Sequence, residues 1–470
     1  MTKPPSPKRP FKTAKPAQAG KPLRPARPQP PERPGLSSRR VAARLLAAVV
    51  DTRTSLDGLT DRGHGHPEFR ALEPRDQALV KAILTVALRR RGTIEAVIAA
   101  CIEKPLPGGA ASLRHILHVG AAQILFLDVP DAAAVDLAVS QADADPRSQR
   151  FAKLVNAVLR RIARERDALL ASVDDSRLDT PAWLFQRWAA AYGEAEAERI
   201  AAIHRVPAPL DFTARRDPAA VAAEIGGEVL PTGTVRLSGG EGLVGDMPGF
   251  AAGNWWVQDA AAALPARLFG DLRGRRAADL CAAPGGKTAQ LAAAGARVTA
   301  LDISASRLRR LKENFARLGL EAETEVGDLA AFRPDEPFDA VLLDAPCSST
   351  GTIRRHPDVA WTKTAEEVEK LAGVQARMLR QAAGLVAPGG LLVFSNCSLD
   401  PVEGEEVARA FLAEHPEFAL EPVRPDEVPG LEAAVTGEGF LRTTPAMLAR
   451  GTPDVSGLDG FFAARLRRRA

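Results

Sequence analysis

The chain contains no long run of apolar residues and few cysteines. No stretch approaches about 18 uninterrupted apolar residues, so the sequence predicts no membrane span. Its four cysteines, at positions 101, 281, 347 and 397, are widely spaced. This spacing argues against both a disulfide framework and a Cys-x-x-Cys zinc site. We therefore expect a cytoplasmic protein with reduced thiols and no bound metal.

Acidic residues are nearly absent from the first 40 residues. This segment holds eleven Lys and Arg, eleven prolines and one acid, Glu32. Its net charge is +10, and because the whole chain carries +4, residues 41–470 carry about −6. Large apolar residues are too few here to form a core, so residues 1–36 are predicted to be a disordered, basic, proline-rich tail. Such a tail either contacts a polyanion or only adds solubility. No apolar segment follows these charges, so we expect no signal peptide.

A length of 470 residues predicts two to four domains, and the first of them is helical. We assign it to residues 37–170. Ser37 and Ser38 are predicted to cap a helix that opens at Arg39, and further helices are predicted over 75–91, 113–126 and 151–162. The last has one apolar face and a basic stripe formed by Arg150, Lys153, Arg160, Arg161 and Arg164. This stripe is either a nucleic-acid contact or an ordinary solvated face.

Strands and helices alternate in the second half of the chain. Residues 171–255 are predicted to form linker helices and a small α+β subdomain, followed by an α/β domain over 256–470. Strands of this domain are predicted at 277–281, 297–303, 322–326, 339–344 and 390–395, and helices at 305–318 and 365–386. The alternation predicts βαβ units and a parallel sheet. Ligands of such sheets bind beyond the carboxyl ends of the strands.

A glycine-containing turn, Asp279–Thr288, follows the first of these strands. Its end, Gly286-Lys287-Thr288, matches a P-loop, but Cys281 stands where the first P-loop glycine belongs and Pro284 lacks an amide hydrogen. A dinucleotide G-x-G-x-x-G pattern is absent. S-adenosylmethionine remains as the third candidate, because it has no phosphates to bind.

Two acids favour this third cofactor. Asp302 ends the second predicted strand, where a carboxylate can accept hydrogen bonds from both ribose hydroxyls. Asp328 follows the third strand, where it can hold an adenine amine. Each alone is a weak signal, and together they indicate an adenosyl ligand.

Two cysteine-serine pairs follow the last two buried strands. Transfer of a methyl group to nitrogen or oxygen needs no thiol, whereas transfer to carbon 5 of a pyrimidine requires a nucleophile that first adds to carbon 6. Cys347 and Cys397 can both supply it, and Asp344 is placed to stabilise the ring nitrogen as charge develops. DNA cytosine methyltransferases use a Pro-Cys thiol, which would point to Cys347, so these residues alone leave the nucleophile open.

Several motifs together resemble those of the RNA cytosine 5-methyltransferases, and of their bacterial 16S ribosomal RNA family RsmB (Sun/Fmu). They are Asp279–Thr288, Asp344–Ser348, Arg354–Asp358, Cys397-Ser398, Trp256–Asp259 and Gly460–Phe462. The segment Arg150–Arg161 is similar to the NusB-like RNA-binding domain of that family. The resemblance covers residues 37–470. It implies a multidomain protein with an all-α NusB-like RNA-binding domain and an α/β Rossmann-like S-adenosylmethionine methyltransferase domain.

The resemblance also implies roles for individual residues. Cys397 would be the nucleophile, Cys347 would assist removal of the carbon 5 proton and release of product, and Asp344 would contact the base. The implied cofactor-binding residues are Cys281, Ala282, Ala283, Pro284, Gly285, Gly286, Lys287, Asp302, Arg307, Asp328 and Asp344.

The chain departs from the family pattern in two places. Asn396 precedes the implied nucleophile where the family has threonine, and Gly404 replaces the asparagine of an acidic-Asn-acidic cluster. We expect activity with altered local contacts. The loop residues Arg354, Arg355 and His356 are predicted either to clamp RNA phosphates or to form an ordinary solvated loop.

The predicted function is transfer of a methyl group from S-adenosylmethionine to carbon 5 of a cytidine in ribosomal RNA. By the resemblance, the RNA is that of the small subunit, before or during its assembly. We expect a monomer that binds neither DNA nor membranes. The alternatives are an idle RNA-binding or ribosome-assembly factor, a transfer RNA methyltransferase and a P-loop NTPase.

Overall fold

The computed structural model describes residues 33–239 and 243–470. The predicted disordered tail falls mostly on residues 1–32, which lie outside the described residues. Residues Gly35–Ala470 form one compact unit. Within the described part of the chain, no helix is both long and apolar enough to cross a membrane.

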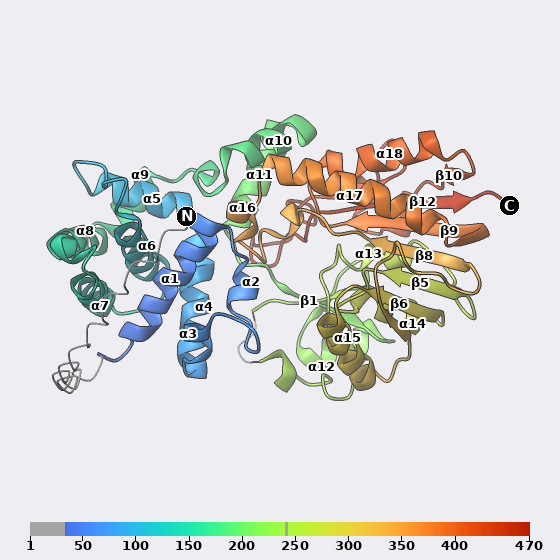
Figure 1. Ribbon diagram of the computed structural model, residues 1–470, viewed down its shortest axis with the longest axis horizontal. Helices are drawn as coiled ribbons and strands as arrows, with labels where there is room; N and C mark the ends of the chain where they lie inside the picture. Colours follow the sequence, from blue (N-terminus) through green and yellow to red (C-terminus); the bar gives the residue numbers. More distant parts are fainter. Residues whose placement is uncertain (1–32, 240–242) are drawn as a thin grey trace, which may run out of the picture. The chain divides into compact units, whose positions relative to one another are not determined.

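The N-terminal part of this unit is helical (Figure 1). Its helices bury one shared core that includes Leu45, Ile83, Leu117 and Leu159. The helices are α1 (Leu36–Thr52), α2 (Leu56–Leu59), α3 (Pro67–Arg70), α4 (Pro74–Arg89), α5 (Arg91–Ala100), α6 (Ala111–Phe126), α7 (Asp131–Ala144), α8 (Ala152–Arg164) and α9 (Arg166–Ser172). The amphipathic face of α8 is buried as predicted, through Val155, Val158, Leu159 and Ile162.

Two predicted helix ends are wrong. The first helix begins at Leu36, after Gly35 in a left-handed conformation, and no side chain caps it. Ser38, predicted as a cap, lies inside α1 and is buried. The predicted helix over 75–91 is broken at Arg90, because Arg90 leaves helical geometry and turns its guanidinium onto the Phe126 ring, 4.8 Å away.

Two further helices and a small sheet lead into the second half of the chain. They are α10 (Ala182–Tyr192) and α11 (Glu194–His204), followed by β1 (Leu210–Ala214), α12 (Pro218–Ile225), β2 (Glu228–Val229), β3 (Val235–Leu237) and β4 (Trp255–Val257). The strands lie in the order β2-β3-β1-β4 and are antiparallel. The small core contains Phe212 and Trp255, whose rings meet edge to face at 4.7 Å.

The large sheet is parallel through its centre and antiparallel at one side. Its order is β10-β12-β9-β8-β5-β6-β7, and β11 also pairs with β12. The bounds are β5 (Arg276–Leu280), β6 (Arg297–Asp302), β7 (Glu323–Val326), β8 (Phe338–Asp344), β9 (Val386–Asn396), β10 (Phe418–Leu420), β11 (Leu441–Thr443) and β12 (Phe461–Arg468). The parallel strand order reverses at β5, so the crevice beyond β5 and β8 is the expected ligand site.

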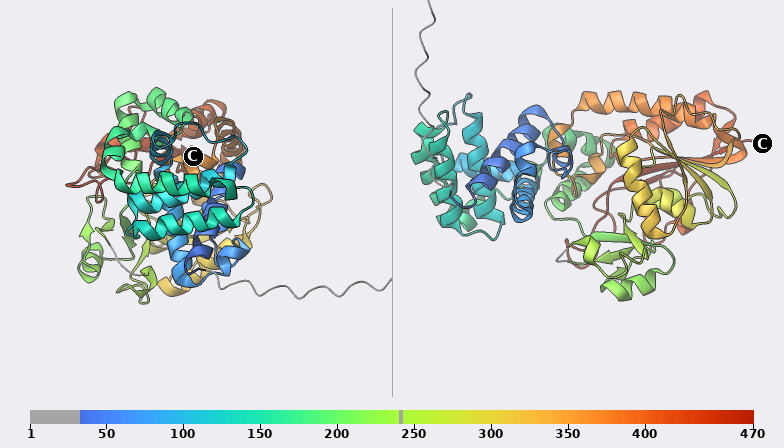
Figure 2. Two further views of the ribbon diagram at one scale, coloured as in Figure 1. Left: turned by 90° about the vertical axis from the view of Figure 1, so that its left-hand side faces the viewer. Right: turned by 60° about the horizontal axis from the view of Figure 1, so that its bottom comes forward.

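Helices cover both faces of this sheet (Figure 2). On one face α17 (Ala365–Ala383) and α18 (Glu405–Glu414) pack on Leu343 and Phe394. On the other lie α13 (Leu264–Arg267), α14 (Gly286–Ala293) and α15 (Ala305–Leu318). The short helical turn η5 (Pro401–Glu403) precedes α18. Helix α16 (Val359–Thr362) contacts α1 of the N-terminal helices. The central strands β8 and β9 are largely apolar, which is the pattern of a sheet buried on both sides, whereas the edge strand β7 is polar and exposed.

A buried ion pair between β1 and β3 of the small sheet also bonds to the chain outside that sheet. Arg236 donates from Nε and Nη2 to the two carboxylate oxygens of Asp211, both at 2.7 Å, and both side chains are almost fully buried. Arg236 also donates to the carbonyl of Val455, and Asp211 accepts from the amide of Ala260. Arg236 and Asp211 therefore each form a hydrogen bond with the chain that follows the small sheet.

Arg236→Met should lower the free energy of unfolding by about 3–5 kcal/mol, because Asp211 would remain buried without its counter-ion. Adding Asp211→Asn should restore part of this loss. The matched control is Arg273→Met, which removes the exposed pair with Asp271 and should cost less than about 1 kcal/mol. Chemical denaturation measures all three variants, and equal losses for Arg236→Met and Arg273→Met would contradict the assignment.

Candidate active site

The carboxyl ends of β8 and β9 bring the two cysteine-serine pairs together. The strands pair in parallel, with Asp344 beside Ser395. Cys397 directly follows β9, and Cys347 lies three residues beyond β8. Their sulfur atoms are 3.4 Å apart, although 50 residues separate them in sequence. The structure thus places both predicted thiols at one point of the sheet edge.

The two thiols differ in acidity. A hydrogen bond from Cys347 lowers the pKa of the Cys397 thiol below its ordinary value, and Lys287 lowers it further against the effect of burial. The same hydrogen bond, with burial, raises the pKa of Cys347 well above its ordinary value. The lowered pKa favours the thiolate, which is the reactive form of a cysteine, at Cys397 rather than at Cys347.

A charged pair lies beside the thiols. Lys287 Nζ, on α14, donates to Asp344 at 2.7 Å, and Ser395 donates to the other oxygen of Asp344 at 2.9 Å. The Lys287 ammonium also lies 4.7 Å from the centre of the Phe461 ring. Lys287 thus connects the glycine-containing turn to the thiol end of the site. Asp344 contacts both parts, through Lys287 on one side and Ser395 on the other.

A second acid holds the neighbouring strand end. Asp302, the last residue of β6, is buried and accepts hydrogen bonds from the amides of Ala283 and Ser304. Arg307 donates to it at 2.9 Å. Asp328 lies two residues beyond β7 and accepts from the amide of Ala330. The two acids follow adjacent parallel strands, as predicted.

The residues at this edge fit an adenosyl ligand. Ile303 directly follows Asp302, Val326 lies two residues before Asp328, and these apolar side chains are 69% and 57% exposed. An adenine ring would cover such surface while the carboxylates accept its polar hydrogens. Gly285, at φ 104°, keeps the turn open, since a side chain there would meet Leu311 at 2.8 Å.

Cys281 lies in the same turn, in surroundings that disfavour a thiolate. It has a positive φ of 69°, and burial raises the pKa of its thiol to about 12. The amide of the next residue, Ala282, donates to Leu301 on β6. Cys281 through Lys287 therefore form a tight turn between β5 and α14 that faces Asp302.

Four residues at the site were not predicted as site residues. Asp279 is buried beside the turn, its pKa is raised to about 7 by burial, and its Oδ1 has no hydrogen-bond partner among the described residues. Ile303, Ser395 and Glu403 are the others. The sequence carries a signal for Ile303, an apolar residue directly after a strand-end acid, whereas the roles of Ser395 and Glu403 depend on neighbours that are distant in sequence.

The predicted phosphate clamp is wrong for both loop arginines. Arg355 is bound to the carboxylates of Asp259 and Asp459. Arg354 is buried and donates only to backbone carbonyls, those of Val206, Pro207, Pro453 and Ser456. His356 is half-exposed, and a hydrogen bond with Asp57 raises its pKa. This loop attaches the catalytic part to the N-terminal helices rather than facing solvent.

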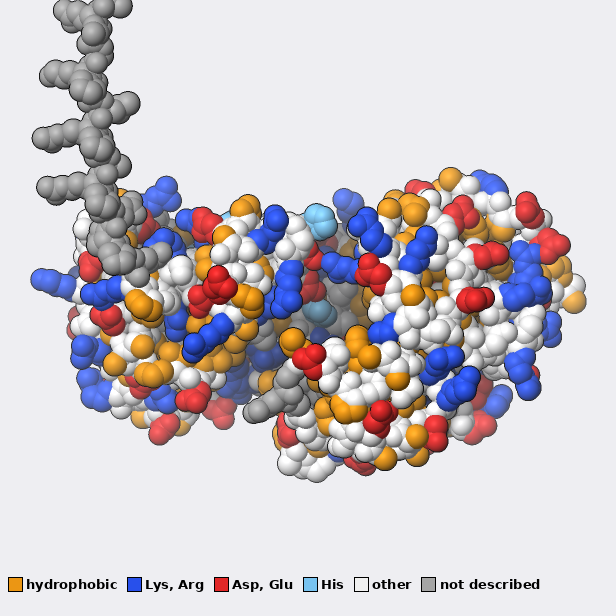
Figure 3. Space-filling model, turned by 90° about the horizontal axis from the view of Figure 1, so that it is seen from below, with side chains coloured by type: hydrophobic (Ala, Val, Ile, Leu, Met, Phe, Trp, Pro, Cys, Tyr) orange, Lys and Arg blue, Asp and Glu red, His pale blue; other side chains and the backbone are white. Residues whose placement is uncertain are grey.

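The basic stripe of α8 remains largely exposed. Arg150, Lys153, Arg160 and Arg164 are exposed, and Arg161 binds Glu165. Lys and Arg side chains are interspersed with Asp and Glu on the face shown in Figure 3. The exposed stripe is available to a polyanion, in agreement with either reading of the sequence.

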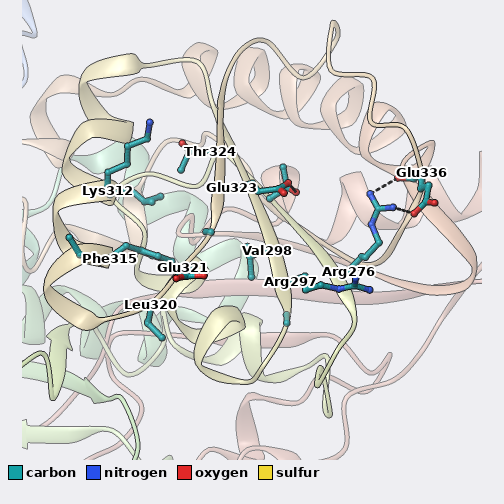
Figure 4. Close-up of a pocket in the computed structure, with 15 residues that line it drawn as sticks. Arg276, Arg297, Val298, Lys312, Phe315, Leu320, Glu321, Glu323, Thr324 and Glu336 are labelled. Carbon is teal, nitrogen blue, oxygen red and sulfur yellow. Dashed lines mark hydrogen bonds and ion pairs between the residues drawn. The ribbon is translucent and has the colours of Figure 1, made fainter.

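A large groove lies elsewhere on the catalytic part and is not this site. It has a volume of 1020 Å³ and runs along the starts of β5, β6 and β7 beside α15 (Figure 4). Arg276 and Glu336 form an ion pair at one end of it, and Lys312 and Phe315 line the other. The groove lies toward the amino ends of the strands, opposite the thiols. Among the described residues, no cluster of His, Cys, Asp and Glu could hold a metal ion.

Two family models match the chain. The 16S rRNA methyltransferase RsmB/F model matches residues 272–467, and the NusB family model matches residues 36–164. Both matched segments correspond to separate groups of elements, the first to the large sheet and its helices and the second to α1–α8.

Two curated relatives and one solved structure match most of the chain, and a second solved structure matches a smaller part of it. Ribosomal RNA small subunit methyltransferase B of Xylella fastidiosa (strain Temecula1 / ATCC 700964) is 38% identical over 451 residues, which cover 92% of this chain and 98% of that protein. The protein of the same name from Sodalis glossinidius (strain morsitans) is 35% identical over 86% of this chain and 96% of its own. The crystal structure of PH0851 superposes with a TM-score of 0.68 at 25% identity, covering 93% of this chain and 99% of that one. A methyltransferase homolog protein from Pyrococcus horikoshii gives 0.51 at 27% identity, over 63% and 99%.

The pH dependence of thiol alkylation tests the acidity of the pair. Cys397 should react with iodoacetamide at pH values where a free cysteine is still protonated, and its rate should fall as the pH drops through its lowered pKa. Cys347→Ala removes the donated hydrogen bond, so the same curve should move to higher pH. Peptide mass spectrometry measures each cysteine separately, with Cys101 as internal reference. An unchanged curve in Cys347→Ala would contradict the assignment.

Asp302→Ala should weaken S-adenosylmethionine binding by about 10- to 100-fold, because charge-assisted hydrogen bonds to the ribose would be lost. Asp335→Ala, an exposed acid in the loop before β8, is the matched control and should leave the affinity unchanged. Isothermal titration calorimetry measures both. Equal affinities for the two variants would remove Asp302 from the cofactor site.

Proposed function

Because the chain belongs to the 16S ribosomal RNA methyltransferase family RsmB/F, we propose that it methylates carbon 5 of a cytidine in small-subunit ribosomal RNA. S-adenosyl-L-methionine is the cofactor, and it supplies the methyl group as an electrophile. Family membership removes the P-loop alternative. The finer points of the proposal are the carbon that is methylated and the covalent bond to Cys397.

The observation that carries the proposal is the pair of sulfur atoms 3.4 Å apart beside Asp344. A methyltransferase acting on nitrogen or oxygen has no use for two thiols at its reacting end. Carbon 5 of cytosine is a weak nucleophile until a group adds to carbon 6, and a thiolate both adds and leaves readily. A paired thiol and thiolate at this point therefore favour pyrimidine carbon chemistry.

In the proposed reaction, the Cys397 thiolate forms a bond to carbon 6, and the electrons of the C5–C6 double bond make carbon 5 nucleophilic. Carbon 5 would then bond to the methyl carbon as the bond from this carbon to the sulfonium sulfur of S-adenosylmethionine breaks, which leaves S-adenosylhomocysteine. A base removes the carbon 5 proton, the double bond re-forms, and the C6–S bond breaks to return the thiolate. Asp344 would contact the ring, and its ion pair with Lys287 would place a cation near the charge developing on the ring nitrogen.

Cys347 is proposed as the group that assists proton removal and product release. In the free enzyme the thiolate of Cys397 is one reason why the pKa of Cys347 is high. Once Cys397 is bonded to carbon, its negative charge is gone and Cys347 becomes easier to ionise. The second thiol thus becomes a base after the first has reacted, which is the order that the reaction requires.

The cofactor is proposed to lie against the turn and the two acids. Cys281, Ala282, Ala283, Pro284, Gly285, Gly286 and Lys287 would approach its amino-acid and ribose portions, together with Asp302, Arg307, Asp328 and Asp344. Asp302 and Arg307 are already hydrogen-bonded to each other, so the carboxylate is held in place before a ligand arrives. Ile303 would add apolar contact to the adenine.

The RNA is proposed to contact the helical domain as well. We propose domain boundaries at 37–170 for the NusB-like domain, 171–255 for the linker helices and small subdomain, and 256–470 for the catalytic domain. The exposed cations of α8 can neutralise phosphates.

We propose action as a monomer in the cytoplasm, on small-subunit RNA before or during assembly. Retention of both thiols, Asp344 and the acids argues against an idle assembly factor.

Cys397→Ala should lower turnover by at least about 1000-fold, because no group would add to carbon 6. Cys347→Ala should instead accumulate a covalent protein–RNA adduct, because release of the intermediate is slowed. Denaturing gel electrophoresis with labelled RNA measures the adduct. If the adduct formed in Cys397→Ala and not in Cys347→Ala, the two roles would be exchanged.

Bisulfite sequencing of ribosomal RNA from cells with and without the gene tests the substrate. We expect one cytidine of the small-subunit RNA to lose its protection, and Cys397→Ala should not restore it. Cys101→Ala is the matched control, since this cysteine lies in the helical domain, and it should restore the protection in full. A change confined to transfer RNA would favour the alternative substrate.

A further inference from the structure

A buried hydrogen-bonded network connects the two cysteine loops behind the sulfur atoms. It is built from residues that carry neither reacting thiol. Glu403, at the end of η5, and Asn396, at the end of β9, are both fully buried. Each bonds to the residue next to one cysteine, and they bond to each other.

Glu403 holds the Cys347 loop. One carboxylate oxygen accepts from the amide of Ser348 at 2.9 Å, and the other accepts from the Ser348 hydroxyl. Gln375, on α17, donates to Glu403 at 2.9 Å and to the carbonyl of Pro346 at 3.0 Å. Burial raises the pKa of Glu403. A buried carboxylate requires such donors, so Glu403 and the residues on both sides of Cys347 hold one another in place.

Asn396 holds the Cys397 loop. Its side-chain oxygen accepts from the amide of Ser398 at 3.0 Å, which closes an Asx turn with Cys397 at its centre. Its side-chain nitrogen donates to the carbonyl of Glu403 at 2.7 Å. The side-chain amide of Asn396 therefore holds the backbone at Ser398, directly after Cys397, and links this backbone to Glu403.

Hydroxyl groups complete the connection between the loops. The Ser348 and Ser398 hydroxyls are 3.1 Å apart, and Thr350 accepts from the amide of Leu399 at 2.9 Å. The amide of Gly351 donates to the carbonyl of Cys397 at 2.9 Å. Hydrogen bonds thus cross-link the Cys347 loop and the Cys397 loop.

Both departures from the family pattern meet at this network. Asn396 donates to the peptide group that directly precedes Gly404. A side chain at Gly404 has no room, because its Cβ would lie 2.5 Å from Nη2 of Arg442 and 2.8 Å from the ring of Phe462. Arg442 is fixed there by its buried pair with Glu405. In this chain the amide at position 396 thus bonds to the carbonyl directly before position 404, where a side chain has no room.

We propose that Asn396 and Glu403 are positioning residues that set the two thiols against each other. Asn396 acts on attack by Cys397, and Glu403 acts on proton removal and release through Cys347. This inference rests on the proposed covalent mechanism. Its physical basis is that a displacement of about 1 Å at a reacting group can reduce a rate by about 100-fold.

The test separates the two steps. In a Cys347→Ala background, where the adduct accumulates, Asn396→Leu should slow adduct formation by about 100-fold. Asn396→Ser retains an acceptor for the Ser398 amide but does not reach Glu403, so it should slow formation by about 10-fold. It also serves as the second variant if Asn396→Leu does not fold. Asn254→Leu and Asn254→Ser, at a partly exposed loop residue of the small subdomain, are the matched controls.

With Cys347 retained, Glu403→Gln should lower kcat by about 10- to 100-fold while adduct becomes detectable, because release is slowed and attack is not. Glu406→Gln, an exposed neighbour on α18, is its control and should show neither change. The affinities for S-adenosylmethionine and RNA, and the melting temperatures, are measured for every variant. A positioning role leaves the KM values for both substrates unchanged.

Opposite outcomes separate the two proposals. If the Cys347→Ala parent forms no adduct, the covalent mechanism fails and the inference fails with it. If the parent forms the adduct but Asn396→Ser and Asn396→Leu form it at the parental rate, only the inference is overturned. It is also overturned if Glu403→Gln loses activity without adduct, or if kcat and both affinities fall together, since a general loss of structure would then explain the effect.

Discussion

The parallel pairing of β8 with β9 is the constraint on which the active site depends. In-register hydrogen bonds place Asp344 beside Ser395, so both strands end at the same level of the sheet. The loops that follow then bring Cys347 and Cys397 to 3.4 Å. On its other side β9 pairs with β12, which fixes Asn396 opposite Phe462. A slip of one residue would turn Asn396 and Ser395 to the opposite faces, and the site would be lost.

Electrostatics divides this site into two halves and connects them. Asp302 and Arg307 lie in the half proposed to bind the cofactor, and the two thiols lie in the half proposed to react. Lys287 belongs to the turn of the first half, yet it pairs with Asp344 and lowers the pKa of Cys397 in the second. The Lys287 ammonium thus connects the turn electrostatically to the Cys397 thiol. The buried Glu403 acts from the other side, since its charge contributes to the high pKa of Cys347.

Long buried strands and amphipathic helices could be predicted from the sequence, because their periodicity is local. The helix at 305–318 has the predicted bounds, and the strand predicted at 339–344 begins one residue earlier, at Phe338. Short strands such as β4 and β11, with three residues each, carry no such period. The Ser38 cap was wrong, because a left-handed Gly35 begins the helix earlier and the core takes Ser38 inside. The antiparallel pairing of β12 with β9 joins residues more than 65 positions apart, and no local pattern encodes such a pairing.

The sequence by itself determined which chemical groups are present: two thiols after buried strands, two strand-end acids and a glycine turn. These groups specify a reaction, because few chemistries use them together. Only the tertiary structure decided how they differ. The pKa of Cys397 is lowered because Cys347 and Lys287 lie next to it in space, and Arg354 and Arg355 are withdrawn from solvent because carbonyls and carboxylates surround them. Acidity and exposure depend on neighbours in three dimensions, and the order of residues along the chain does not contain them.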